Sequence, residues 1–144
     1  MSPFPFPADG LGAAADFARR LDELRRSGEN RTRAALMSLV EVADAVERLA
    51  NDPALAELPS NWRDGLSALT GKIAAALAEQ GVTPIPTNGQ TLDLRLHHVA
   101  ETCDGPGEPD RIVRAIRAGW LWNERVLRPA EVVTVKAAPQ DSSP

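Results

Sequence analysis

The sequence predicts an α+β fold in which a long N-terminal helix and a shorter second helix precede a small C-terminal β-region. Residues 11–50 contain no proline and repeat apolar side chains at helical spacing. A second helical repeat follows Pro59 and stops before Gly81. Beyond Gly81 the chain is rich in turn residues and alternates apolar with polar side chains, which is typical of short strands.

The composition favours helices packed on helices. The chain has 144 residues, enough for one compact domain, or for one small domain attached to an elongated part. Apolar residues make up 43% of it but aromatic residues only 4%, so much of the apolar share is alanine and leucine. The net charge of −4 would repel phosphate backbones, and we therefore expect no general nucleic-acid binding.

Compartment and cysteine content give further expectations. Cys103 is the only cysteine, which excludes an internal disulfide and a thiolate zinc site. The first ten residues alternate Phe and Pro and lack the basic start and apolar core of a signal peptide. No stretch approaches the roughly 18 apolar residues of a membrane span. We expect a soluble cytoplasmic protein with disordered tails at 1–10 and 138–144.

The long helix carries an apolar stripe. Its C-terminal part repeats apolar residues at steps of three and four, namely Leu36, Leu39, Ala43, Val46 and Ala50. Phe17, Leu21 and Leu24 form a similar stripe in another phase. The residues between them predict either one helix with a weak joint near Gly28 or two helices in line. Forty helical residues would reach about 60 Å. Such a stripe needs a partner, either in an intramolecular hairpin or in a dimer.

The second helix has recognisable ends. Pro53 and Pro59 interrupt the first helix, and Asp52 is placed to cap a short helical turn. Ser60 is the expected N-cap of the next helix and Gly81 its expected C-cap. The apolar residues between them again recur at a three-four spacing: Trp62, Leu66, Leu69, Ile73 and either Ala76 or Leu77.

The β-region is expected to hold short strands. Leu92, Leu94 and Leu96 alternate with polar residues, which by itself indicates a strand. The segment 103–110 reads "CDGPGEPD" and is a predicted loop. Two further strands, 112–118 and 126–135, are expected to be joined around residues 119–124.

Residues suited to catalysis are sparse. Adjacent His97 and His98 would point to opposite faces of a strand and cannot share a metal. The glycines at 105 and 107 lie among prolines and acidic residues, which suit phosphate poorly. Asp44, with its helical neighbours Glu47 and Arg48, is expected on a solvated face. We therefore predict no enzyme, metal or cofactor; the rival is a small enzyme centred on His97, His98 and Glu101.

One motif is specific. The segment 119–135, "GWLWNERVLRPAEVVTV", places a proline and two arginines within an apolar run. It resembles the C-terminal signature of the GrpE family, the nucleotide exchange factors of DnaK-type chaperones. That signature has a Gly-aromatic turn, an arginine, then Leu-Arg-Pro-Ala and a valine-rich strand. The residues that match it in order are Gly119, Trp120, Arg125, Leu127, Arg128, Pro129 and Ala130.

The resemblance extends upstream to about Leu36. Gly89, Asp93 and His97 match a Gly-x-x-Phe-Asp-Pro-x-x-His-Glu segment, whereas Leu94 and His98 replace its proline and glutamate. The family forms a turn there, and this conflicts with the strand suggested by alternation. The end of the long helix, "LVEVADAVERLA", resembles the family's Leu-x-x-x-Asp-x-Leu-Glu-Arg-Ala. The family usually has a longer tail and a longer helix.

The resemblance implies a homodimer and a chaperone partner. Residues 11–80 would form the long helix and a bundle helix that dimerise, and residues 81–137 a β-domain. That domain would bind the nucleotide-binding domain of a DnaK-type chaperone and promote ADP release, with no cofactor, nucleic acid or membrane involved. The expected dimer contacts are Leu36, Leu39, Ala43, Val46, Leu66, Leu69 and Ile73. The expected partner contacts are Ile116, Gly119, Trp120, Arg125, Arg128, Pro129 and Ala130.

Three residues of this set have distinct expected roles. Arg125 should project from the turn towards an acidic group of the partner, and Arg128 should hold the edge of the β-region. Ile116 is expected to make apolar partner contact, with core packing as its alternative. A rival to the exchange factor is a helical dimeric adaptor, a diverged paralogue that binds another partner through its β-region.

Overall fold

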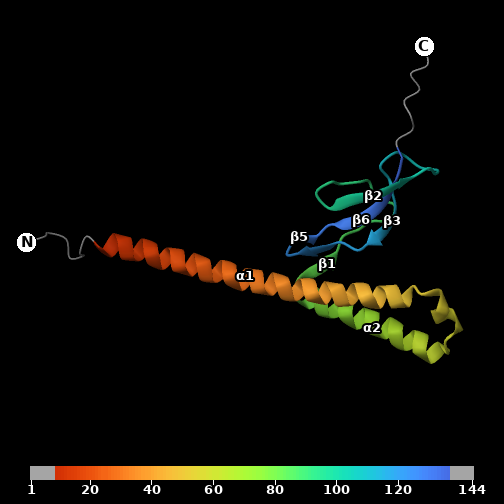
Figure 1. Cartoon of the computed structure of the whole chain (residues 1–144), viewed down its shortest axis with the longest axis horizontal. Coiled ribbons are helices and arrows are strands. Elements are labelled where there is room, and N and C mark those ends of the chain that lie inside the picture. Colours follow the sequence, from red (N-terminus) through yellow and green to blue (C-terminus); the bar gives the residue numbers. More distant parts are fainter. Residues whose placement is uncertain (1–8, 137–144) are drawn as a thin grey trace, which may run out of the picture. The chain divides into compact units, whose positions relative to one another are not determined.

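The computed structural model describes residues 9–136, which contain two α-helices, one 3-10 helix and six strands (Figure 1). The described part of the predicted tails, Asp9 and Gly10, is helical, and the remainder of both tails lies outside the described residues. Contacts divide the chain into two units within the first helix, residues 1–36 and 37–144. The second unit therefore combines the end of the long helix, the second helix and the β-region.

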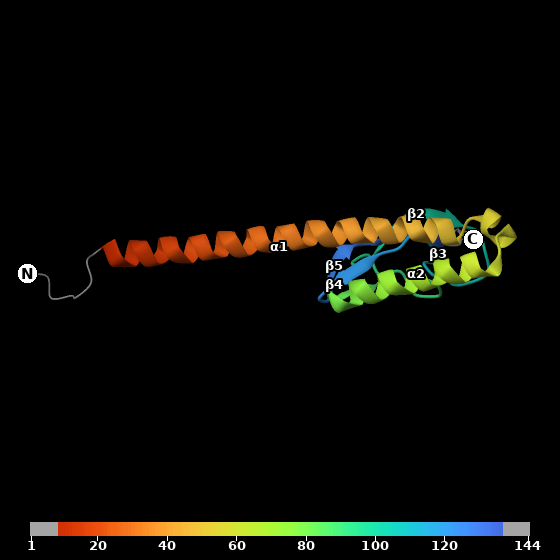
Figure 2. The same ribbon diagram turned by 90° about the horizontal axis from the view of Figure 1, so that it is seen from below.

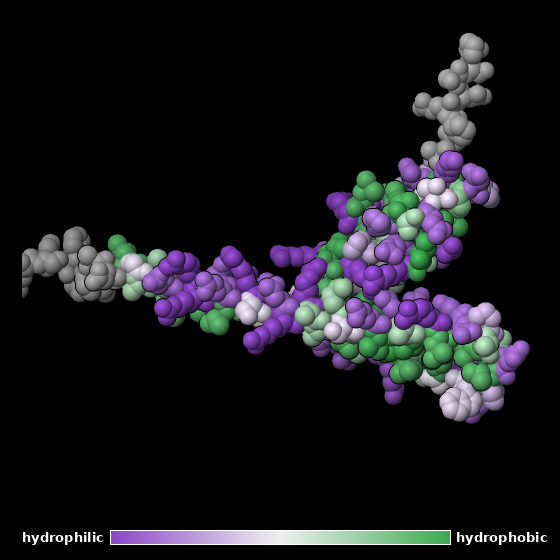
Figure 3. All heavy atoms as spheres, in the orientation of Figure 1, coloured by the Kyte–Doolittle hydropathy of each residue, from purple (hydrophilic) through white to green (hydrophobic). Residues whose placement is uncertain are grey.

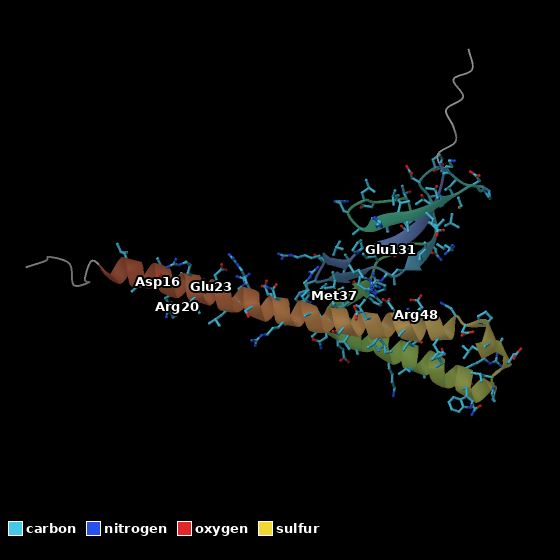
Figure 4. All side chains as sticks on the ribbon, viewed as in Figure 1. Asp16, Arg20, Glu23, Met37, Arg48 and Glu131 are labelled. Carbon is cyan, nitrogen blue, oxygen red and sulfur yellow. The ribbon has the colours of Figure 1, made fainter. Side chains whose placement is uncertain are left out.

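The first helix, α1 (Asp9–Ala50), is continuous. Of the two expectations, the single helix is confirmed, because neither a proline nor a turn interrupts it at Gly28. Ion pairs one turn apart line its exposed surface, as between Arg26 Nη2 and Asp22 Oδ2 at 2.6 Å. Asp16, Arg20 and Glu23 belong to the same charged first unit (Figure 4).

A capped turn joins the helices. Asp52 accepts a hydrogen bond from the Ala54 N–H at 2.9 Å and begins the 3-10 helix η1 (Pro53–Glu57), which confirms the predicted cap. The helix α2 (Ser60–Glu79) follows. Ser60 is its first helical residue, so the predicted N-cap is wrong: Pro59 occupies that position and makes no side-chain capping hydrogen bond. The C-cap of α2 is Gln80 and not the expected Gly81, which follows it with φ of +78°.

The helices of the second unit form a hairpin. Both views show α2 running back beside residues 37–50 of α1 (Figures 1 and 2). Leu77 of α2 and Val40 of α1 are fully buried. Val46 and Ile73, one from each helix, line a common pocket, so the stripes predicted for the two helices do meet within one chain.

The β-region consists of two three-stranded sheets. One has the order β1-β4-β5 and is antiparallel, with strands Val82–Pro84, Trp120–Trp122 and Arg125–Arg128. The other has the order β2-β6-β3, with strands His97–Cys103, Ala130–Val135 and Ile112–Arg117. In it β6 pairs parallel with β2 and antiparallel with β3. Side chains from both sheets and from the loops build one core, which includes Ile85, Ile112, Ala130, Val132, Leu121 and Val126.

Three expectations for this region require correction. The predicted strand 126–135 is two strands of different sheets, because Pro129 lacks the N–H that would continue a ladder. The predicted connection 119–124 contains β4. Residues 92–96 form a turn, in which the Leu96 N–H donates to the Asp93 carbonyl at 2.9 Å. The strand suggested by alternation is therefore wrong, and the turn implied by the family resemblance is correct.

Candidate functional site

The hairpin of β4 and β5 presents Arg125. Its two-residue loop, Asn123-Glu124, has φ values of +49° and +68°, as a twist-matched tight turn requires. The Asn123 N–H donates to the Gly81 carbonyl at 3.0 Å, and a Cβ at Gly81 would overlap Asn123 Oδ1. The tip of the hairpin is thus anchored on the end of α2. Arg125, the first residue of β5, is exposed beside this fixed turn.

The structure separates the seven predicted partner contacts into two groups. Ile116, Arg125 and Pro129 are exposed, and Ile116 keeps 44% of its accessible surface, so it does not serve as core packing. Gly119, Trp120, Arg128 and Ala130 are buried within the chain. A buried side chain has no surface to offer a partner, and we assign these four to the support of the exposed group.

Two of the buried residues hold the sheets together. The Gly119 carbonyl accepts the Ile85 N–H at 2.9 Å, and a Cβ at Gly119 would lie 2.7 Å from Ala130 Cα. The glycine therefore permits a close approach of two backbone segments. Trp120 faces a pocket of about 160 Å³ that it shares with α1 and α2, and its indole N–H has no acceptor among residues 9–136. This ring packs the β-region on the helices.

Arg128 has more partners than the sequence suggested. Its guanidinium donates to the Ala118 carbonyl from Nε at 3.1 Å and from Nη2 at 2.6 Å, which confirms that it holds the β-region's own edge. It also forms a two-pronged ion pair with Asp44 of α1, at 2.6 and 2.8 Å. Asp44 was expected on a solvated face, and that expectation is wrong because its side chain is only 19% exposed.

A groove of about 450 Å³ lies between α1 and β3. Asp44, Glu47, Arg48 and Asn51 line its helical side, and residues 115–118 with Glu131 line its sheet side. Figure 4 labels Arg48 and Glu131 on these two sides. Ile116 forms part of its wall, so an exposed apolar side chain lies beside both acidic and basic groups. This combination suits a protein partner better than a small ligand.

The turn 93–97 forms a second exposed feature. Leu94 at its tip is 80% exposed. Asp93 accepts hydrogen bonds from the Arg95 guanidinium, at 3.2 and 3.0 Å, and from the Arg95 backbone N–H, at 2.9 Å. Hydrogen bonding from the Arg95 side chain is the main cause that lowers the pKa of Asp93, and the same bonds raise the pKa of Arg95.

Of the two adjacent histidines, His97 is held in place by hydrogen bonds at both ring nitrogens. Nδ1 of buried His97 accepts the Asp93 N–H at 3.0 Å, and Nε2 lies 2.9 Å from the Pro86 carbonyl, to which it can only donate. Both ring nitrogens are thereby occupied. His98 is exposed on the other face. Among residues 9–136, no three His, Cys, Asp or Glu side chains lie together as a metal site would need.

An apolar face extends along the helical hairpin (Figure 3). Large apolar side chains of both helices and of their connection are exposed: Leu39, Val42, Leu49, Leu58, Trp62 and Leu69. Several of them line a groove of about 530 Å³ with Leu55 and Leu66. None of the helices in the described segment is long and apolar enough to span a membrane.

The predicted dimer contacts fall on different parts of this hairpin. Leu39 and Leu69 are exposed, whereas Leu36 is buried within its own chain. The half-buried ones are Ala43, Val46, Leu66 and Ile73. The sequence analysis placed Trp62 in the stripe of the second helix but did not single out Val42 and Leu49, whose spacing from Leu39 is also three and ten residues along one helical stripe.

Comparisons of the sequence with known proteins all point to one family. A family model described as GrpE matches residues 13–136. Protein GrpE of Chlorobium luteolum is 33% identical over 135 residues, which cover 88% of this chain and 68% of that protein. Protein GrpE of Xanthomonas oryzae pv. oryzae is 31% identical over 134 residues, which cover 90% of this chain and 77% of that protein. Protein GrpE of Lactiplantibacillus plantarum is 30% identical over 100 residues, which cover 68% of this chain and 50% of that protein. The matched region thus spans from half to about three quarters of these relatives' length.

Proposed function

Because the chain belongs to the GrpE family, we propose that it is a nucleotide exchange factor that binds the nucleotide-binding domain of a DnaK-type chaperone and promotes ADP release. The observation that carries this proposal is the extent of the family match, which takes in both helices and both sheets. The exposure of Arg125 and Ile116 supports it, since both are available for contact with a partner.

The proposed mechanism is a shift of the chaperone's conformational populations. A protein that binds the open nucleotide-free form better than the closed ADP form must weaken ADP binding by the same factor. This requires complementary surface and no covalent chemistry. The engagement of both His97 nitrogens in structural hydrogen bonds agrees with a role that uses no general base.

We further propose that two copies associate through the apolar face of the helical hairpin. A contiguous set of large exposed apolar side chains marks an interaction surface in a soluble domain. Separately, Leu11, Phe17, Leu21 and Leu24 are exposed on the first unit, where a helix without a partner would leave them in water. A second copy offers the same stripe and is the simplest partner for both surfaces.

The test of the exchange function measures release of a fluorescent ADP analogue from a DnaK-type chaperone by stopped flow. The protein should accelerate release without hydrolysing nucleotide. An unchanged rate at saturating protein would contradict the proposal. Recovery of a different protein in pull-downs would then favour the adaptor.

Arg125→Ala tests the contact surface. We expect binding to weaken by about 2 kcal/mol, roughly 30-fold, as for a residue that dominates an interface. The melting temperature should stay nearly unchanged because Arg125 is exposed. Arg63→Ala, at an exposed position of α2, is the matched control and should bind as the wild type does. Equal calorimetric affinities of Arg125→Ala and wild type would remove Arg125 from the surface.

A further inference from the structure

We propose that the Asp44–Arg128 ion pair is the joint that fixes β3 against α1 and so positions Ile116 for the partner. This inference rests on the proposed exchange function. Asp44 and Arg128 are 84 positions apart, and nothing in their local sequence requires them to meet. The pair is therefore a positioning device that becomes visible only in the folded chain.

The geometry of the pair leaves little freedom. Arg128 Nη1 and Nη2 donate to the two carboxylate oxygens of Asp44 at 2.6 and 2.8 Å, so the contact fixes orientation as well as distance. The Arg128 side chain is only 7% exposed. Its Nε and Nη2 also donate to the Ala118 carbonyl. One guanidinium thereby joins α1, the end of β5 and the connection between β3 and β4.

The joint lies directly beside the proposed contact surface. Ala118 follows Ile116 by two residues, and both line the groove of which Asp44 forms part of the opposite side. Arg117 Nε lies 3.6 Å from Asp44 Oδ2 and forms a second, more exposed link across the same groove. The bonds of Asp44 to Arg128 and Arg117 therefore set the separation of α1 from β3. That separation in turn sets the position of the Ile116 side chain.

The chemistry of both side chains is specific to this role. A lysine at position 128 would keep the charge but could not donate to Asp44 and to Ala118 in fixed directions. An asparagine at position 44 would keep the shape but remove the charge, and Arg128 would remain buried without its counterion. The residues 115–119 should then separate from the helix more often, while β6 stays paired with β2.

The test compares Asp44→Asn with Glu41→Gln, which removes one carboxylate from an exposed position of the same helix. Hydrogen exchange of the amides at 115–119 should rise about tenfold in Asp44→Asn, with no matching rise in β2, which pairs with the other edge of β6. Stimulation of ADP release should fall about tenfold. Glu41→Gln should match the wild type in both measurements. Unchanged hydrogen exchange at 115–119, or raised hydrogen exchange with unchanged ADP release, would overturn the inference.

Two further arms keep the result decisive. If Asp44→Asn does not fold, Asp44→Glu replaces it, since it keeps the ion pair but lengthens it by one methylene. We expect Asp44→Glu to melt within a few degrees of the wild type and to stimulate ADP release about threefold less; equal stimulation would overturn the inference. A wild type without exchange activity would overturn the proposed function and, with it, the positioning role. The amide measurement alone would then decide whether the pair joins α1 to β3.

Discussion

At the scale of single residues, Gly119 illustrates how one missing side chain lets the connection between β3 and β4 approach the start of β6 closely. A Cβ at this position would overlap the Ala130 backbone nitrogen and lie 2.7 Å from its Cα. Backbone atoms of a buried strand cannot move aside as the end of a flexible side chain can. The family motif identifies the glycine, but only the fold shows which atoms exclude every other residue.

Gly119→Ala should therefore lower the free energy of unfolding by about 2–3 kcal/mol, in the upper part of the range for overpacking a core. The control is Gly105→Ala, because a Cβ at Gly105 would meet nothing within 4 Å. Thermal unfolding followed by circular dichroism would show a drop of several degrees for the first variant only. Equal melting temperatures of Gly119→Ala and Gly105→Ala would mean that the backbone segments at Gly119 and Ala130 move apart at little cost in free energy.

Residue-scale prediction from the sequence reached its limit at Arg128. The motif and the strand pattern were sufficient to predict that Arg128 holds the β-region's edge, and its bonds to Ala118 confirm this. They could not reveal Asp44, because two side chains of opposite charge 84 residues apart carry no local signal of contact. The partner-contact roles of Ile116, Arg125 and Pro129 stay predictions, now supported by exposure.

At the scale of elements, the β4–β5 hairpin is built on a turn that its sequence fits incompletely. Both loop residues have positive φ, and the position usually taken by glycine in such turns holds Glu124, at +68°. A side chain in the left-handed region costs about 1–2 kcal/mol. The surrounding structure, including the bond from Asn123 to Gly81, maintains this conformation.

Glu124→Gly should accordingly raise the free energy of unfolding by about 0.5–1 kcal/mol, since relief of the strain exceeds the entropy that glycine adds to the unfolded chain. The comparison is Glu101→Gly in β2, where glycine brings no relief of φ and should destabilise. Urea unfolding of both variants measures the difference. A lower midpoint for Glu124→Gly would show that the Glu124 side chain stabilises the turn by contacts that outweigh its strain.

Element lengths explain which parts of the fold the sequence predicted. The helices span 42 and 20 residues, long enough for several repeats of the three-four spacing. The second was predicted with nearly correct bounds, and the first was predicted as helical over nearly its whole length but left open as one helix or two in line. The strands β1 and β4 span three residues each, too few for an alternating pattern to stand out. In residues 92–96 alternation was present but misleading, because hydrogen bonds around Asp93 and His97 close a turn there.

At the scale of the whole molecule, the apolar face of the helical hairpin is the feature that a single chain leaves unexplained. Trp62 retains 66% of its accessible surface and Leu49 retains 55%. Each square ångström of such surface removed from water contributes about 25 cal/mol. In the proposed dimer, covering this face would supply free energy against the entropy of association.

We expect light scattering after chromatography to give twice the chain mass of 15.4 kDa at micromolar concentration. Leu39→Lys places a charge on the apolar face and should shift the mass towards one chain, with helical content largely retained because Leu39 is exposed. Leu94→Lys adds the same charge at an exposed apolar position on the turn 93–97 and should leave the dimer intact. A wild-type mass of one chain would exclude the dimer. A Leu39→Lys dimer as tight as wild type would place the interface away from this face, which would then remain available to another partner.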